Sequence, residues 1–165
     1  MLKKCWSIFQ PRDKPAIALI TKNKHMRADF YLIAKPRFIE KPLLLVCELA
    51  RKAHDSGQSL LILVNSITQA EVLDDLLWEF DPDAYIPHQI AGHDEDDDIT
   101  PVLIVAPETD APMRALVINL RNTPVLGQFE RVLEVVPADA SAREPLRARW
   151  KYYQSLGFEL KKIDM

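Results

Sequence analysis

Glycine is scarce in this chain, and its distribution limits the folds and sites that the sequence can form. The 165 residues include only 4 glycines, Gly57, Gly92, Gly127 and Gly157, whereas glycine usually makes up about 7% of a protein. P-loop and dinucleotide-binding motifs need two or three glycines within about eight residues, because the backbone must approach a phosphate closely. The sequence therefore contains neither motif, and for the same reason it has no G-x-S-x-G turn.

Length and composition predict one globular domain, and the small number of cysteines is consistent with the cytoplasm. Hydrophobic residues make up 48% of the chain and charged residues 27%, with a net charge of -3. A chain of this length buries roughly 70% of its extended surface, so it needs no disulfide or structural metal. The two cysteines, Cys5 and Cys47, allow one bridge at most and suit a reducing compartment. No apolar run approaches the ~20 residues that span a bilayer, so we expect no membrane contact.

The first 27 residues differ from the rest of the chain in charge. They contain seven basic residues and one acid, a net +6, so residues 28–165 carry -9. We treat residues 1–27 as a basic N-terminal extension and residues 28–165 as the domain. Three interpretations of the extension stay open: an arm that binds single-stranded DNA, a weakly ordered tail, or translated sequence upstream of a start at Met26. The acidic domain itself repels phosphate, so we expect it to bind no nucleic acid directly.

The domain alternates short apolar runs with helical periodicity. Strands are predicted over 28–33, 59–65, 85–90, 102–106, 116–120 and 132–136, and helices over 41–56, over 66–80 and in a last segment that ends at 156. Ser66 is the predicted cap of the second helix, and Gln69 completes a capping box. Continuous apolar strands between helices are typical of a mainly parallel sheet covered on both faces. The predicted fold class is α/β, with a nucleotide-binding-like topology but no phosphate loop.

No set of residues suited to catalysis is evident in the sequence. An enzyme needs a nucleophile with a base, a pair of carboxylates in a cleft, or a metal, and the four histidines, His25, His54, His88 and His93, are scattered along the chain. The acidic run 93–98 lacks the ligand spacing of an EF-hand loop, and we interpret it as a solvated loop. We therefore expect a binding protein with no catalytic residue, metal or cofactor. The rival hypothesis is an enzyme whose cleft leaves no motif.

Trp78 interrupts the pattern of the second predicted helix. At about 100° per residue, one apolar stripe contains Val72, Leu73, Leu76, Leu77 and Phe80. Trp78 falls on the opposite side, among acidic residues, and should point to water. Tryptophan is enriched in binding hot spots, so we expect a contact surface that Tyr85, Ile86 and Pro87 continue. The alternative is that another part of the chain covers Trp78.

The last predicted helix carries a second candidate contact surface. Arg143, Arg147 and Trp150 follow one another at i, i+4 and i+7, which places them on one face of an unbroken helix, with Arg149 and Lys151 nearby. Arginine pairs with carboxylates in a bidentate way, and an indole supplies an apolar wall. A short acidic peptide that ends in an aromatic residue fits this face. The alternative is a solvated basic face near a helix C-terminus.

Several segments, taken together in their order and spacing, resemble the chi subunit of bacterial DNA polymerase III over residues 28–160. They are Asp29-Phe30-Tyr31-Leu32, Cys47, Leu73-Asp74-x-x-Leu77-Trp78, Ile86-Pro87-His88-x-x-Ala91-Gly92, Val117-Ile118-Asn119-Leu120, Phe129, Val136-Pro137 and Arg147-x-Arg149-Trp150-x-x-Tyr153-x-x-x-Gly157-Phe158.

The resemblance implies an adaptor without chemistry of its own. Chi proteins connect single-stranded DNA-binding protein (SSB) to the polymerase through the psi subunit of the clamp-loader assembly, at replication forks. The resemblance places Trp78, Tyr85, Ile86 and Pro87 on the psi-binding surface, which an XPD-like helicase can also use. It places Val136, Arg143, Arg147 and Trp150 in the pocket for the acidic, Phe-terminated C-terminal tail of SSB.

Three features of the sequence depart from the family pattern. By its resemblance to the family, Arg143 stands at a position where other members have Lys, and Trp150 at one where they have Tyr. Charge and aromaticity are therefore kept. Pro145 favours the first turn of a helix, and a helix that began there would leave Arg143 on the preceding turn. The basic extension has no counterpart in the family. A further hypothesis is that the acidic loop 94–100, which resembles the SSB tail, competes for the same pocket.

Overall fold

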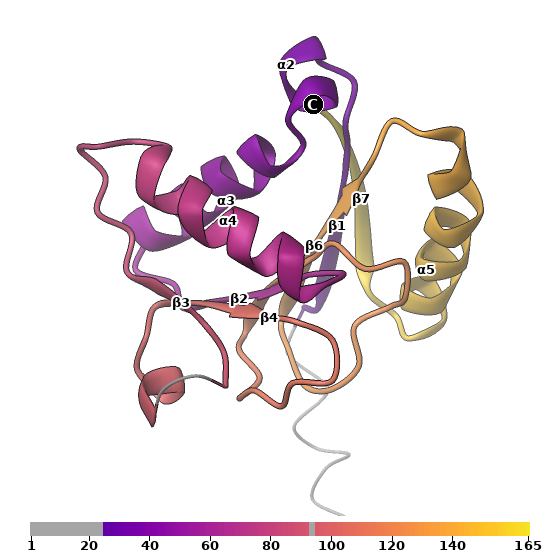
Figure 1. Cartoon of the computed structure of the whole chain (residues 1–165). Coiled ribbons are helices and arrows are strands. Elements are labelled where there is room, and N and C mark those ends of the chain that lie inside the picture. The colour runs from indigo at the N-terminus through magenta and orange to yellow at the C-terminus, as the bar shows by residue number, and fades with distance from the viewer. Residues whose placement is uncertain (1–24, 93–94) are drawn as a thin grey trace, which may run out of the picture.

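A parallel sheet of seven strands forms the centre of the protein (Figure 1). The structure is a computed structural model and describes residues 25–92 and 95–165. The strands are β1 (Arg27–Leu32), β2 (Leu60–Leu63), β3 (His88–Ile90), β4 (Val102–Val105), β5 (Leu116–Asn119), β6 (Arg131–Val136) and β7 (Glu159–Asp164), in the order β3-β4-β2-β5-β6-β1-β7. Every neighbouring pair is parallel. The predicted α/β class is confirmed, and the sheet is wholly rather than mainly parallel.

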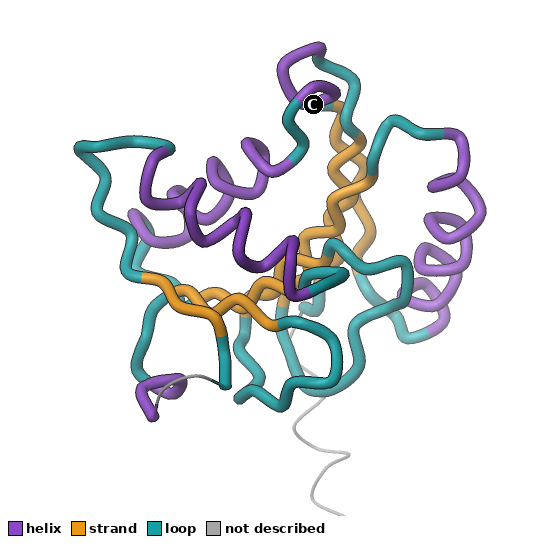
Figure 2. Tube along the Cα trace, viewed as in Figure 1, coloured by secondary structure: helices purple, strands orange, loops and turns teal. Residues whose placement is uncertain are grey.

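Helices cover both faces of the sheet, but unequally (Figure 2). The helices are α2 (Pro36–Glu40), α3 (Leu43–Asp55), α4 (Ile67–Glu79) and α5 (Arg143–Ser155), with short 3-10 turns η1 (Glu95–Asp98) and η2 (Ala140–Ala142). Residues of α2, α3 and α4 share one apolar core with the sheet. On the opposite face α5 packs over β1 and β6, and loops cover the rest.

The central strands are buried on both faces, which explains their continuous apolar sequences. Leu60 and Ile62 of β2 pack under α3 and α4, whereas Leu61 between them faces the core on the α5 side. All four residues of β4 and of β5 are buried. Successive strand residues point to opposite faces, so a strand between two layers is apolar at nearly every position. The polar exception in β5 is Asn119, which hydrogen-bonds Glu134.

The predicted cap of α4 is present, although its reciprocal bond differs from the prediction. The Ser66 hydroxyl oxygen accepts a hydrogen bond from the Gln69 backbone N–H at 3.1 Å. The Gln69 side chain in turn accepts from the backbone N–H of Asn65 at 2.8 Å, where a capping box would use that of Ser66. The two bonds satisfy donors at the start of α4 and fix its direction as it leaves β2.

The sequence analysis missed β7 and α2 and was wrong about one residue of the α4 stripe. β7 is an edge strand that pairs with β1 alone, and its polar residues are exposed. Such a strand has no apolar run to reveal it. The short α2 begins at Pro36, which suits a first turn. Val72 is 50% exposed, because the buried face of α4 centres on Ala70, Leu73 and Leu77.

Several sequence-based expectations concern residues 1–24, 93 and 94, which lie outside the described residues. They include most of the basic extension, Cys5, and the start of the acidic run. The described cysteine, Cys47, is buried and free, and burial raises the pKa of its thiol to about 12. In residues 25–92 and 95–165, no helix combines the length and apolar character needed to cross a bilayer.

We predict that Ser66→Ala lowers the free energy of unfolding by about 1 kcal/mol, because the Gln69 N–H loses its acceptor at the start of α4. Urea unfolding followed by circular dichroism measures this change. The matched control is Ser141→Ala, which removes an exposed hydroxyl and should change stability by less than about 0.5 kcal/mol. Equal effects of the two substitutions would contradict a capping role.

Two candidate contact surfaces

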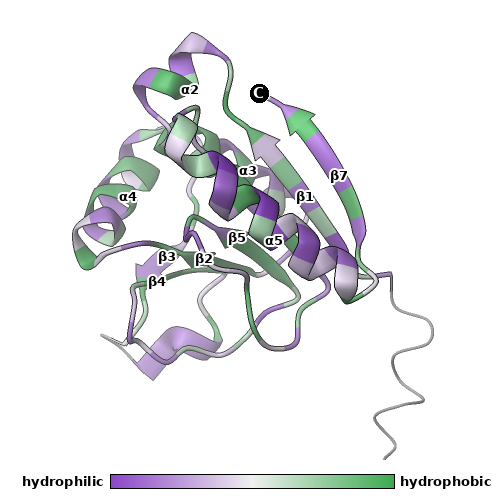
Figure 3. Cartoon of the chain, turned by 90° about the vertical axis from the view of Figure 1, so that its right-hand side faces the viewer, coloured by the Kyte–Doolittle hydropathy of each residue, from purple (hydrophilic) through white to green (hydrophobic). Residues whose placement is uncertain are grey.

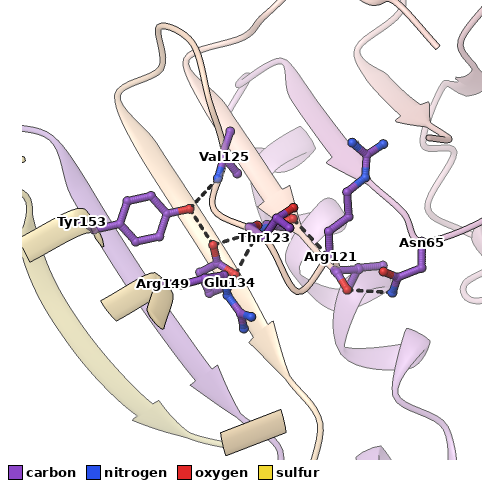
Figure 4. A network of polar contacts seen from close by, with 9 residues as sticks. Asn65, Arg121, Thr123, Val125, Glu134, Arg149 and Tyr153 are labelled. Carbon is purple, nitrogen blue, oxygen red and sulfur yellow. Dashed lines mark hydrogen bonds and ion pairs between the residues drawn. The ribbon is translucent and has the colours of Figure 1, made fainter. Parts of the chain in front are cut away.

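A buried ion pair attaches α5 to the sheet. Arg149 of α5 and Glu134 of β6 are 2% and 0% exposed, and the distance from Arg149 Nε to Glu134 Oε2 is 2.9 Å. The Tyr153 hydroxyl donates to Glu134 Oε1 at 2.7 Å and accepts from the Val125 N–H at 2.9 Å. Asn119 Nδ2 donates to both oxygens of the same carboxylate, at 2.9 and 3.1 Å (Figure 4).

The environment of Glu134 acts on its pKa in two directions. Burial raises the pKa of the carboxyl group, while the Arg149 charge and the hydrogen bonds from Asn119, Tyr153 and Arg149 lower it. Burial also raises the pKa of the Tyr153 phenol, and the neighbouring Glu134 charge adds to this effect. The phenol therefore remains a donor to Glu134. Arg149 was expected beside the exposed basic face, and this expectation is wrong, since its guanidinium is inside the domain.

With one side of α5 fixed in this way, its other side presents the predicted basic residues to solvent. The helix begins at Arg143, so Pro145 lies within its first turn and Arg143, Arg147 and Trp150 belong to one helix. Arg143 and Arg147 are exposed, and Trp150 is half-buried with its ring 5.0 Å from that of Phe30. Figure 3 shows α5 in front of the sheet, with hydrophilic residues along much of its length.

Two adjoining hollows lie between α5 and the edge of the sheet, and we call them together the α5 surface. The larger, of about 370 Å³, is lined by Phe30, Leu32, Leu146, Arg147, Trp150, Lys151 and Lys162. The smaller, of about 170 Å³, is lined by residues that include Val136, Asp139, Arg143 and again Leu32 and Leu146. The two hollows share Leu32 and Leu146 and therefore lie side by side, and Val136, which lines the smaller one, is buried.

The α5 surface combines positive charge with an apolar floor. Lys162 comes from β7, and the sequence analysis missed it because that strand was not predicted. The Lys162 ammonium lies 3.8 Å from Asp164, whereas no ion pair joins Arg143 or Arg147 to another described residue. These two guanidinium groups can therefore pair with carboxylates of a ligand. An anionic peptide with one large apolar side chain matches this arrangement.

The second candidate surface lies at the opposite edge of the sheet, where α4 ends and the chain enters β3. Trp78 is 50% exposed and Tyr85 is 70% exposed, with ring centroids 5.6 Å apart. Pro87 is half-buried and lies in the short segment of the chain between Tyr85 and β3. Ile86 is only 2% exposed and belongs to the core under α3 and α4, so the expectation that its side chain continues the patch is wrong. We call Trp78, Tyr85 and Pro87 the Trp78 surface.

The order of the strands separates the two surfaces. The Trp78 surface adjoins β3 on the α4 face, whereas the α5 surface adjoins β1 and β7 on the other face. The acidic turn η1 adjoins β3 and β4, away from α5 (Figure 1). Asp97 in that turn accepts hydrogen bonds from Gln89 Nε2 at 2.6 Å and Gly92 N–H at 2.9 Å. In this arrangement η1 does not reach the α5 surface, contrary to the hypothesis of competition.

Arg121 occupies part of the crevice in which nucleotide-binding α/β domains commonly place their ligand. That crevice lies at the carboxyl ends of adjacent strands whose connections leave on opposite faces, here β2 and β5. Arg121 Nε donates to the Val64 carbonyl at 2.9 Å and Nη2 donates to the Val105 carbonyl at 3.0 Å. Asn65 Nδ2 donates a hydrogen bond to the Leu120 carbonyl oxygen at 2.8 Å. Beside Arg121 a hollow of about 300 Å³ remains, lined by the loops after β4 and β5.

Comparison with known proteins identifies close relatives in sequence. A family model described as "DNA polymerase III chi subunit, HolC" matches residues 26–161. The DNA polymerase III subunit chi of Pseudomonas aeruginosa is 33% identical over 138 residues, which cover 81% of this chain and 93% of that protein. The subunit chi of Escherichia coli is 33% identical over 119 residues, covering 70% and 80% of the two chains.

Two solved structures with a similar fold are of a DEAD-box protein. The C-terminal domain of the DEAD-box protein Dbp5 matches with a TM-score of 0.59 at 15% identity, covering 86% of this chain and 91% of that one. The structure of S. cerevisiae Dbp5 bound to RNA and ADP BeF3 matches with a TM-score of 0.55 at 16% identity, covering 84% and 41%. At this level of identity the likeness concerns the fold alone.

We predict that Glu134→Gln and Arg149→Met each lower the free energy of unfolding by about 3–5 kcal/mol, because each leaves a buried partner without its counter-charge. The double variant should lose less than the sum of the two, since no unpaired charge remains. Urea unfolding of the four proteins completes this cycle. Strictly additive losses would contradict a coupled pair at the base of α5.

Proposed function

The chain belongs to the DNA polymerase III chi subunit family, and from this we propose that it is a non-catalytic adaptor of the replicative holoenzyme. In this proposal it links the psi subunit of the clamp loader to the acidic C-terminal tail of SSB, in the cytoplasm at replication forks. The observation that carries it is the presence of two surfaces of different chemistry at opposite edges of one sheet.

The α5 surface is the proposed site for the SSB tail. The terminal carboxylate and nearby aspartates of the tail pair with Arg147 and Arg143, and its terminal phenyl ring enters the apolar hollow beside Trp150 and above Val136. Hydrogen bonds between charged groups contribute roughly 1.5–3 kcal/mol each, and less at exposed groups such as these. One tail therefore binds with micromolar-class affinity that falls as salt is added.

Attachment of many tails compensates for the weakness of one contact. SSB presents several tails, and an adaptor held on the clamp loader meets them at a raised effective concentration. Weak individual contacts that exchange rapidly allow the polymerase assembly to follow the SSB-covered strand. A single tight contact at the α5 surface would not serve this purpose.

The Trp78 surface is the proposed site for psi. Trp78 and Tyr85 present about half or more of their aromatic surface to solvent, and aromatic residues of this kind dominate the energy of protein interfaces. An XPD-like helicase is the second candidate partner, because it would use the same exposed indole. Direct binding of single-stranded DNA would depend on the basic extension, since residues 28–165 carry a net charge of -9.

We predict that Arg147→Ala weakens binding of an SSB tail peptide at least about tenfold, through loss of a charge-assisted contact, and leaves psi binding intact. Titration calorimetry with the peptide measures the affinity. The matched control is Lys52→Ala, which makes the same change of charge on the exposed side of α3, on the other face of the sheet. Unchanged peptide affinity in Arg147→Ala would refute the assignment of the α5 surface.

We predict that Trp78→Ala abolishes co-purification of psi and leaves peptide binding unchanged, because it removes the centre of the exposed aromatic pair. Leu126→Ala is the matched control, as it truncates another highly exposed apolar side chain. Loss of both psi and peptide binding in Trp78→Ala would indicate misfolding. Retention of psi would show that psi binds elsewhere.

A further inference from the structure

His88 lies beneath the Trp78 surface, and its ring is in contact with that of Trp78. Its side chain is inaccessible to solvent, and its ring centroid is 4.6 Å from that of Trp78. It is the first residue of β3 and pairs with Val102 of β4, so its backbone belongs to the sheet. The imidazole therefore connects the rigid sheet edge to the exposed indole.

Both ring nitrogens of His88 face oxygen atoms. Nδ1 is 2.6 Å from the carbonyl oxygen of Ile86, in the segment that carries Tyr85 and Pro87. Nε2 is 3.0 Å from the carbonyl oxygen of Asp74 in α4 and 3.4 Å from its carboxylate oxygen Oδ1. A neutral imidazole has one N–H and can donate to only one of these sides, whereas the imidazolium donates to both.

The carbonyl of Asp74 also belongs to the helical turn that ends at Trp78. In an α-helix the carbonyl of residue i accepts from the N–H of residue i+4, and Trp78 follows Asp74 by four positions. A hydrogen bond from His88 to this carbonyl therefore fixes the last turn of α4 against β3. The hydrogen bond to Ile86 fixes the loop on the other side of the indole.

We infer that His88 is the positioning residue of the Trp78 surface: its imidazolium form joins α4 to the loop before β3 and holds Trp78 and Tyr85 in the arrangement that the partner meets. This inference rests on the proposed function for the identity of that partner, psi. Loss of one ring proton releases either Ile86 or Asp74, so the surface loosens as pH rises. The His88 side chain is buried, so it would act on the partner indirectly, through the position of Trp78.

Among the described contacts of the imidazole, one is with a charged group. On α4 the Asp74 carboxylate is the charged group in contact with it, and on β4 its strand partner Val102 is apolar. Tyr85, in the loop, contacts Trp78, and the described ring contacts of His88 are with Trp78 alone. Deprotonation of His88 therefore also removes the attraction to Asp74.

The first test uses the full chain without a partner. Long-range proton–nitrogen NMR spectra report whether each ring nitrogen of His88 is protonated, and the indole N–H signal of Trp78 reports its surroundings. The two signals are assigned with His88→Gln and Trp78→Phe. Spectra are recorded between about pH 5.5 and about pH 8, and we expect the two signals to change together, because the indole of Trp78 contacts the imidazole. A Trp78 signal that does not move as His88 titrates would overturn the inference.

The second test measures psi affinity across the same pH range. We expect affinity to fall about fivefold as pH rises in the unaltered chain, as expected for the loss of one hydrogen bond. The dependence should be absent in His88→Gln and unchanged in the control His54→Gln, which alters a half-exposed histidine at the end of α3. A purely structural role would weaken His88→Gln equally at every pH and leave the unaltered chain without this dependence, which would contradict the inference.

A third variant covers the case in which His88→Gln does not fold. Asp74→Asn keeps the backbone carbonyl but removes the carboxylate, so the fall in affinity and the change of the Trp78 signal with pH should both become smaller. An unchanged dependence on pH in this variant would contradict the role of the ion pair. If psi binds nowhere on the unaltered chain, the proposed function fails, while the NMR test still decides whether His88 positions Trp78.

Discussion

The buried pair of Glu134 and Arg149 determines where α5 lies, and the α5 surface depends on that position. Two charges removed from water are tolerated only with good geometry and further hydrogen bonds. Here Asn119 and Tyr153 supply those bonds to Glu134, whereas the buried Arg149 Nη1 has no hydrogen-bond partner among the described residues. The same contacts join β5, β6, α5 and the loop at Val125. Apolar contacts of Leu146, Trp150 and Tyr153 add to these directional bonds on the inner side of α5, and its outer side carries the exposed cations.

The sequence predicted those parts of the fold whose burial leaves a pattern. β2 and β4 are covered on both faces and are apolar at every position, and β5 is apolar up to its last residue, Asn119. Ser66 caps α4 and marks its first turn in the sequence. β7 could not be found in this way, since an edge strand with exposed lysines resembles a loop in sequence. Ile86 shows the converse limit, because a short extended segment does not reveal which of its side chains turn inward.

The candidate site was predicted in part, for a related reason. Helical phase correctly separated Trp78 from the buried residues of α4, and it grouped Arg143, Arg147 and Trp150. Phase alone gave no reason for Arg149 to be buried, since a buried arginine requires a partner, and Glu134 lies on a strand distant in sequence. Lys162 and His88 join their surfaces through the tertiary fold, which brings β7 beside α5 and β3 beside α4.

A parallel α/β sheet usually offers its ligand site at the carboxyl ends of the strands, and here Arg121 and Asn65 use that space for hydrogen bonds within the chain. The exposed features lie instead at the two lateral edges, on opposite faces. Sites at opposite edges of the sheet with no shared side chain are expected to contribute independently to binding, so in the proposed function one partner can exchange while the other stays bound. Independence of this kind is what an adaptor requires, whereas an enzyme gains from bringing its groups together. The position of the two surfaces on the sheet thus agrees with tethering better than with catalysis.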